Sequence, residues 1–392
     1  MKKIFKYILP AFVFTMAMMV TSCSVDEIVD PNNPSLASVT NDASKAELQT
    51  LITGLEARHR NYYGSATQMF GSFGREVWAF FGSDPRFISH WLGTGISDTY
   101  PDFFASAGTY ISPYLAVKQA NVLIDAANAS TSLTGPEQAG YSGFAKTVKG
   151  HQLLYPLLQQ FNNGIRTDVA DPLNPGPIQD YDDALAVIRN VLDEGFSELN
   201  GAAISFGLSS GYSGFSDAAG LASINRAIAA RAALYAGDYP GALSALTNSF
   251  MNLNASTAAE LQVGPAHVYG QSPDINNPLF YPFDRPTSTI LVVHPALVED
   301  ALPGDGRLSK FAERVTNPAA SAGLGIPGNY QDARWATNAS PIPYIRNEEL
   351  ILIYAEAKLF TNDVDEAIDA INTIRNIWGV GPYTGGTSTD EV

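Results

Sequence analysis

The sequence predicts a mostly α-helical protein in which antiparallel helix pairs stack into a scaffold, decorated by long irregular loops with little β structure. Three observations predict this class. Residues 346–379 have the pattern of two amphipathic helices joined by a short polar turn, the same pattern occurs earlier in the chain, and two long stretches rich in Pro and Gly lack it. One helix pair leaves an apolar face that it cannot cover, so further pairs must pack beside it.

The helix pair at 346–379 follows from the spacing of its apolar residues. Each helix has one apolar stripe at helical spacing, and the members of the two stripes are Leu350, Ile353, Tyr354 and Ala357, then Ala367, Ile371, Ile374 and Trp378. Such spacing places each stripe on one face of a helix. The segment Thr361-Asn362-Asp363 separates the stripes, and Asn and Asp favour turns and helix N-caps. Two helices joined by so short a link must pack antiparallel.

Earlier segments repeat this arrangement. Residues 236–243 align with residues 361–368, and each segment carries an Asp (Asp238 or Asp363) before an Ala and an aliphatic residue. The helix that precedes the first of these turns is predicted at 221–235 because its apolar residues keep helical spacing.

A third pair is predicted from a helix at 144–161 and a second helix that follows Tyr181, with an insertion rich in Pro and Gly, 162–178, between them. The pairs are therefore degenerate tetratricopeptide-like units, interrupted by insertions rather than spaced regularly. An ordinary helical domain with recurrent Ala-Leu pairs is the alternative interpretation.

Two further helices are predicted from apolar spacing at 43–63 and 110–128. Two irregular segments interrupt the scaffold, at about 64–108 and 252–345. The first has the composition of short helices and loops, and the second contains short strand-like fragments such as 290–293. A helical scaffold that carries long loops on one face is typical of binding proteins.

The N-terminus predicts a lipoprotein. Residues 1–22 combine a basic start with a short apolar run and small residues at the end, which is the pattern of a signal peptide. The segment Val20-Thr21-Ser22-Cys23 resembles the bacterial lipobox, in which Cys23, the only Cys of the chain, becomes the lipidated first residue. Residues 23–42 are then an extended tether and residues 43–392 the folded domain. A plain signal peptide with an unrelated Cys is the alternative.

Charge and motifs argue against several classes of function. The net charge of −16 leaves no basic face for nucleic acid. The five His are isolated from one another, and no HExxH, GxSxG or phosphate-binding Gly-rich motif is present, so the sequence predicts no metal, no cofactor and no catalytic centre. A carboxylate pair for glycoside hydrolysis stays open because distance in the fold defines such a pair. The loop from Asp171 has oxygen ligands that suit calcium but lacks the EF-hand order, which favours a solvated loop.

Aromatic residues are concentrated in the two irregular segments. The first segment holds Trp78, Phe80, Phe81, Trp91 and Tyr100, and the second holds Tyr269, Tyr281, Phe283, Tyr330 and Trp335. Aromatic rings stack on the apolar faces of sugars, while Asp, Asn and Arg bond to hydroxyl groups. Burial in the core is the alternative for each ring taken alone. Trp335 lies among polar residues without apolar periodicity, which favours its exposure.

Several segments together resemble the SusD/RagB outer-membrane lipoproteins of Bacteroidetes. The lipobox is followed by Ser24-Val25-Asp26-Glu27, which is similar to a surface-export tag, and further matches lie at 114–123, 144–161, 230–243, 305–307, 342–357 and 367–379. The last two are the most specific, since an Arg-x-x-Glu start leads into LIYAEA and an INTIR helix follows the turn. Family members usually continue beyond the region where this chain ends, at Val392, so a C-terminal part is expected to be missing.

The resemblance implies a non-catalytic protein that binds a polysaccharide or oligosaccharide at the cell surface. It also implies delivery of that ligand to a SusC-like TonB-dependent transporter in the outer membrane, where the lipid anchor holds the protein. A RagB-like protein that binds peptides, a surface glycoside hydrolase and a purely structural scaffold are the alternatives.

Ligand contacts vary across this family, so the candidate site residues are chosen from local context. The predicted stacking platforms are Trp78, Trp91, Tyr281, Phe283 and Trp335. The predicted polar partners are Asp84, Arg86 and Asp332.

Overall fold

The computed structural model describes residues 40–81, 107–171, 173–285, 289–316, 319–320 and 327–392. Most of them are helical, which confirms the predicted fold class. The long helices are α3 (Lys45–His59), α4 (Tyr63–Phe73), α6 (Ser112–Ala129), α7 (Gly135–Gln160), α8 (Tyr181–Leu199), α9 (Ala218–Tyr235), α10 (Tyr239–Thr247), α13 (Asn347–Phe360) and α14 (Val364–Ile377). Shorter helical turns are η2 (Ala107–Ile111), η3 (Phe161–Asn163), η4 (Ser210–Tyr212), α11 (Ala258–Leu261), α12 (Ala296–Glu299) and η5 (Gly306–Lys310). None of these helices is long and apolar enough to cross a membrane.

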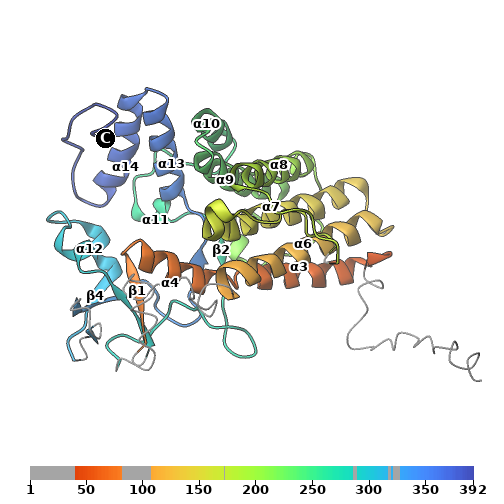
Figure 1. The fold of residues 1–392 in the computed structure, drawn as a ribbon, viewed down its shortest axis with the longest axis horizontal. Coiled ribbons are helices and arrows are strands. Elements are labelled where there is room, and N and C mark those ends of the chain that lie inside the picture. Colours follow the sequence, from red (N-terminus) through yellow and green to blue (C-terminus); the bar gives the residue numbers. More distant parts are fainter. Residues whose placement is uncertain (1–39, 82–106, 172, 286–288, 317–318, 321–326) are drawn as a thin grey trace, which may run out of the picture. The chain divides into compact units, whose positions relative to one another are not determined.

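The long helices pack in the order of the chain. Helix α3 contacts α6, α6 contacts α7, and the contacts continue through α8, α9, α10, α13 and α14 (Figure 1). The predicted pairs α7–α8, α9–α10 and α13–α14 are all present. The apolar stripe of α13 is buried as predicted, with Leu350 and Ala357 fully covered. Stacking therefore covers the apolar face that each pair leaves open.

Acidic residues begin several of these helices. Asp180, Asp217 and Asp238 each accept a hydrogen bond from the backbone N–H three residues later, at 2.9, 2.7 and 2.9 Å. Such caps satisfy N–H groups that the first helical turn leaves free. Asp363, which aligns with Asp238 in sequence, has a different role, because its carboxylate pairs with Lys358 at 3.0 Å. The two turns thus share an Asp at the same position, but its carboxylate makes a different interaction in each.

Helix α7 begins at Gly135 rather than near Phe144, so the predicted start was wrong. The backbone N–H of Thr134 donates to the Glu137 carboxylate at 2.8 Å, which forms part of a capping box. Pro136 follows in the first turn, where a missing N–H costs nothing. The first half of α7 is rich in small residues and lacks an apolar stripe, so the spacing of apolar residues does not predict it.

Helices α7 and α8 approach closely at Gly143. A Cβ atom added there would lie 2.9 Å from the Gly195 carbonyl oxygen and 2.7 Å from Leu199 Cγ. Gly143→Ala is therefore expected to lower the free energy of unfolding, measured in urea, by about 1–3 kcal/mol. The matched control is Gly135→Ala at the exposed start of the same helix, where an added Cβ meets no atom within 4 Å. An equal loss in both variants would contradict the steric explanation.

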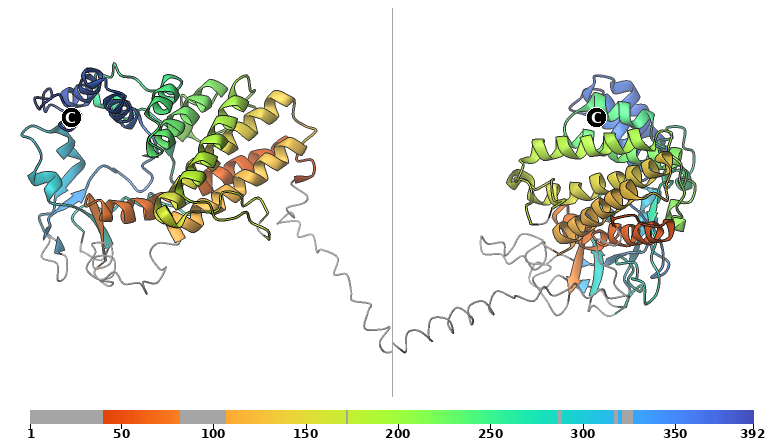
Figure 2. Two further views of the ribbon diagram at one scale, coloured as in Figure 1. Left: turned by 45° about the horizontal axis from the view of Figure 1, so that its top comes forward. Right: turned by 90° about the vertical axis from the view of Figure 1, so that its right-hand side faces the viewer.

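A small antiparallel sheet lies beside the helices. Its order is β1 (Val77–Phe81), β3 (Thr289–Val293), β7 (Tyr330–Asp332) and β4 (Phe311–Glu313), with Val77 opposite Val293 and Val292 opposite Gln331. Two-stranded pairs are formed by β2 (Ala266–His267) with β8 (Ile342–Pro343) and by β5 (Ala319–Ala320) with β6 (Pro327–Gly328). Figure 2 shows the larger sheet near the end of α4, away from α6 and α7. Both irregular segments thus contribute strands to one sheet, and the first also contains helix α4.

Candidate functional site

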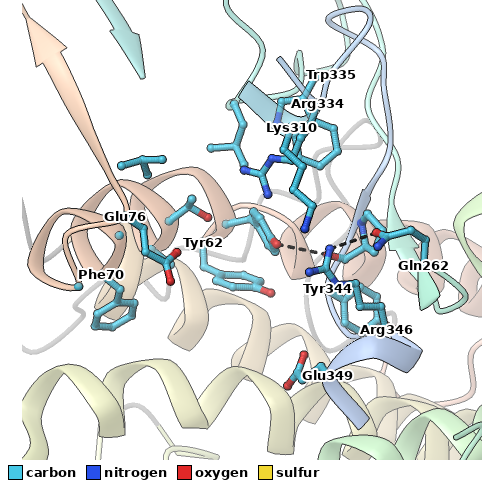
Figure 3. Close-up of a pocket in the computed structure, with 18 of the residues that line it drawn as sticks. Tyr62, Phe70, Glu76, Gln262, Lys310, Arg334, Trp335, Tyr344, Arg346 and Glu349 are labelled. Carbon is cyan, nitrogen blue, oxygen red and sulfur yellow. Dashed lines mark hydrogen bonds between the residues drawn. The ribbon is translucent and has the colours of Figure 1, made fainter. Parts of the chain in front are cut away.

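A cavity of about 780 Å³ lies between α4, the segment after β7 and the N-terminal end of α13. Figure 3 shows Tyr62 and Phe70 on the α4 side, with Lys310, Arg334 and Trp335 facing them from the loop side. The volume suits a small oligosaccharide or a compound of similar size, since ligand pockets commonly span about 300–1,000 Å³.

The α4 wall is aromatic. Tyr62 is almost fully buried, and the Tyr63 hydroxyl donates to the Pro343 carbonyl oxygen at 3.2 Å. That bond ties α4 to β8. Tyr63 and Phe70 also pack against a small apolar cluster formed by Met69, Tyr269, Leu279, Leu291 and Ile342. Packed aromatic rings therefore form this wall of the pocket.

The opposite wall carries three cations from three segments. Lys310 ends η5, and its ammonium lies 5.0 Å from the centre of the Trp378 ring. Arg334 follows β7, and Arg346 precedes α13, where its guanidinium donates to Gln262 Oε1 at 3.1 Å. Burial lowers the pKa of Lys310; the Glu348 carboxylate opposes this shift, and nearby arginines add to it.

An ion pair lies at the base of the pocket. Arg231 from α9 donates to both carboxylate oxygens of Glu349 from α13, at 2.6 and 2.8 Å, and to the Tyr344 carbonyl oxygen at 3.0 Å. Burial alone would lower the pKa of Arg231, but the Glu349 carboxylate outweighs burial and raises it. The pair links two helical repeats and fixes the direction in which α13 enters the site.

Three histidines meet beneath the pocket. His59 Nε2 lies 2.8 Å from His151 Nδ1, and His151 Nε2 lies 3.2 Å from the Arg231 guanidinium. His267 stacks on Tyr344, with 4.7 Å between ring centres. Because a guanidinium only donates, His151 Nε2 must accept, and His151 Nδ1 carries the hydrogen that it donates to His59. The hydrogen of His59 is then on Nδ1, the buried atom that has no partner among the described residues.

All three rings are neutral in this environment. Burial lowers the pKa of His59 to about 3. Burial, then His59 and Arg231, hold the pKa of His151 well below its usual value, and burial does the same for His267. The cluster could not be predicted from the sequence because the three residues come from distant segments, although His59 continues the apolar stripe of its helix.

Metal binding receives no support from the described residues. They contain no group of three or more His, Cys, Asp or Glu arranged to hold an ion. In the loop considered for calcium, the Asp171 carboxylate accepts bonds from the Leu173 N–H at 2.9 Å and from Asn174 Nδ2 at 2.8 Å. The carboxylate therefore closes a local turn.

Two of the predicted site residues lie at the pocket. Trp335 lines it half-buried, with the Arg334 guanidinium 5.2 Å from its ring centre. Asp332 is buried, and its carboxylate is bound by Arg334 at 2.8 and 2.6 Å. Asp332 thus orients Arg334 rather than facing the open pocket. Sequence reasoning missed Arg334 and Lys310, although the Asp-x-Arg spacing was visible.

Two other predicted residues, Tyr281 and Phe283, do not belong to the described lining of the pocket. Tyr281 is half-buried and packs on the same small apolar cluster as Trp335, whereas Phe283 is 53% exposed. Trp78 is in β1, opposite Val292 of β3. The positions of Trp91, Asp84 and Arg86 lie outside the described residues.

Sequence comparison identifies no relative, because no family model and no curated protein matches the chain. The fold does match solved structures. A SusD-like carbohydrate-binding protein from Bacteroides vulgatus is 16% identical, with a TM-score of 0.63, and the match covers 88% of this chain and 78% of that chain. For surface glycan-binding protein A from Bacteroides uniformis, the values are 14% identity, a TM-score of 0.63, and 88% and 83% of the two chains.

A laminarin-binding SusD-like protein gives a similar result. It is 16% identical, with a TM-score of 0.60, and the match covers 87% of this chain and 85% of that chain. At sequence identities this low, the matches show a common fold and say nothing about a common ligand. The chain therefore has the SusD-like fold, as its helix pairs and sequence motifs predict.

Proposed function

We propose that this protein binds a polysaccharide or oligosaccharide nutrient at the cell surface, in the pocket beside α4. The observation that carries the proposal is the SusD-like fold together with a large pocket that combines aromatic rings and hydrogen-bond donors. Apolar sugar faces pack on such rings, and hydroxyl oxygens accept from Arg and Lys. The structural neighbours include a carbohydrate-binding and a laminarin-binding protein, which supports the same ligand class.

The proposed role is binding without catalysis. The described lining holds two carboxylates, Glu76 and Glu349, and Arg231 holds Glu349 through paired hydrogen bonds. Glycoside hydrolysis needs a pair of carboxylates, and the oxygens of Glu349 are occupied by its guanidinium partner, so only Glu76 is left in the described lining. We place the protein in the outer membrane, anchored through Cys23, where it hands the ligand to a SusC-like TonB-dependent transporter.

The test is isothermal titration calorimetry of the mature domain against a glycan panel and a peptide mixture. Binding of at least one glycan and of no peptide supports the proposal. Binding of peptides alone would replace it with peptide capture. A parallel assay for released reducing ends checks catalysis, and their release would overturn the non-catalytic role.

Trp335→Ala is expected to weaken glycan binding by about 1–3 kcal/mol if a sugar stacks on the ring. The matched control is Phe360→Ala, which truncates a half-exposed ring that stacks on Tyr239 at the far end of α13. Affinities come from the same titrations, and circular dichroism checks folding. An unchanged affinity in a folded Trp335 variant would remove this ring from the site.

A further inference from the structure

The cationic wall of the pocket has hydrogen-bond donors that the chain does not use. Lys310 forms no ion pair with any described residue. Its ammonium instead lies over the Trp378 ring. Burying an ammonium without a carboxylate partner is unfavourable. The lowered pKa of Lys310 reflects that cost. An anion that reached Lys310 would remove the cost.

Arg334 stands beside Lys310 with one edge free. Its Nε and one terminal nitrogen bind the two oxygens of Asp332, whose side chain is only 1% exposed. This bidentate contact fixes the plane of the guanidinium. The second terminal nitrogen has no partner among the residues that the structure describes, and it supplies two further donors.

Arg346 completes the wall from the N-terminal end of α13. Its two terminal nitrogens contact Gln262 Oε1 at 3.1 Å and Glu348 Oε2 at 2.9 Å. Figure 3 shows Lys310, Arg334 and Arg346 on one side of the pocket, while Glu76 lies on the other side. The second carboxylate of the lining, Glu349, is bound by Arg231. In a chain of net charge −16, the side of the pocket with unused donors is thus cationic.

We propose that the pocket selects saccharides that carry an anionic group, a carboxylate or a sulfate, and that this group binds Lys310 and the free edge of Arg334. The inference rests on the proposed glycan-binding function and narrows its ligand class. The sugar ring then lies against Trp335 and Phe70, which line the same pocket. Charge-assisted hydrogen bonds in a partly desolvated site are stronger than neutral ones, so the anionic group gives the ligand its selectivity.

The test compares ligands that differ only in charge. Titration calorimetry measures oligogalacturonate and mannuronate oligosaccharides, the same oligosaccharides with their carboxyl groups reduced to alcohols, and a sulfated galactan oligosaccharide. At least one anionic ligand is expected to bind ten-fold or more tightly than its neutral counterpart, and its affinity is expected to fall as salt is added. Comparing the affinities of the carboxylated and sulfated oligosaccharides identifies which anion the pocket prefers.

Variants then assign the effect to the pocket. Lys310→Met is expected to reduce the affinity for the anionic ligand at least ten-fold and to reduce the affinity for the neutral counterpart far less, because a neutral hydroxyl loses only one uncharged partner. Lys310→Arg is expected to retain most of the affinity for the anionic ligand. Lys118→Met on α6 removes an exposed lysine that is not part of the pocket lining and should change neither affinity.

Three outcomes would overturn the inference. Equal binding of anionic and neutral ligands, or unchanged binding of the anionic ligand in folded Lys310→Met, contradicts it but leaves glycan binding intact. Binding of no saccharide in the full panel contradicts the proposed function as well. Thermal unfolding of each variant separates a loss of ligand contact from a loss of fold.

Discussion

Replacing Glu349 with Ala is expected to lower the free energy of unfolding by about 3 kcal/mol, because it leaves the buried Arg231 cation without its partner. The Arg231 side chain is 10% exposed, and its Nε and one terminal nitrogen bond to Glu349. In the variant Nε loses its acceptor, and the terminal nitrogen keeps only the Tyr344 carbonyl oxygen. The expected loss is at the low end for such pairs because the Glu349 side chain is 34% exposed.

The effect of Glu349→Ala should extend beyond stability. Arg231 also contacts His151 and the Tyr344 carbonyl oxygen, so its displacement would disturb the floor of the pocket. Urea denaturation followed by circular dichroism measures the loss. Glu356→Ala is the control, since Glu356 lies on the exposed side of the same helix and a change there is expected to stay within about 0.5 kcal/mol. Comparable losses in the two variants would contradict the assignment of the loss to the ion pair, because Ala is a better helix former than Glu and helix propensity alone lowers neither stability.

The helix pairs were predictable because their signal is local. Each apolar stripe lies within one helix, and the turn residues at 236–243 and 361–368 follow directly. The start of α7 was missed because small residues such as Gly143 form its buried face. These residues lack the large apolar side chains by which a helix is recognised in a sequence. Periodicity therefore identifies helices that pack through large side chains and overlooks those that pack through close backbone approach.

The sheet and the pocket were not predictable in the same way. Trp78 pairs with Val292, more than half the chain away, and the strands are too short for alternation to show. Lys310, Arg334 and Arg346 come from three segments that only the fold brings together. Asp332 was chosen as a ligand partner from its polar surroundings, yet its carboxylate is buried under Arg334. The polar residues around Asp332 identified the loop that lines the pocket, but they did not identify Arg334 as the side chain that faces it.

Acid is expected to destabilise this protein well before its carboxylates titrate. His59, His151 and His267 are buried and neutral, and each has a pKa below its usual value. In the unfolded chain, each titrates near pH 6.5. Above that pH neither state binds the proton, so the full stability is present. As the pH falls below it, only the unfolded state binds protons, and stability is lost.

The size of the loss follows from the linkage between proton binding and folding. Each buried neutral histidine costs about 1.4 kcal/mol for every pH unit below 6.5, so three together cost about 6 kcal/mol between pH 7.5 and pH 5. Glu56 has the opposite effect, because burial raises its pKa and a raised carboxyl pKa adds stability as the pH falls. Carboxylates with lowered pKa values, such as Glu137 at about 2, add their own loss only below about pH 4.5. Between pH 7.5 and pH 5, the loss of stability as the pH falls therefore comes from the histidines.

Removing one histidine should reduce this pH dependence by a predictable amount. His267→Phe keeps a ring that can stack on Tyr344 but removes one titrating group. Its stability is expected to fall less steeply, by about 1.4 kcal/mol per pH unit, when urea denaturation is measured at several pH values between 5 and 7.5. A stability that stays constant over this range in the unmodified protein would show that the rings take up protons in the folded state. In that case the Arg231 guanidinium could not hold His151 as a neutral acceptor, because a protonated His151 has no lone pair to accept its hydrogen bond.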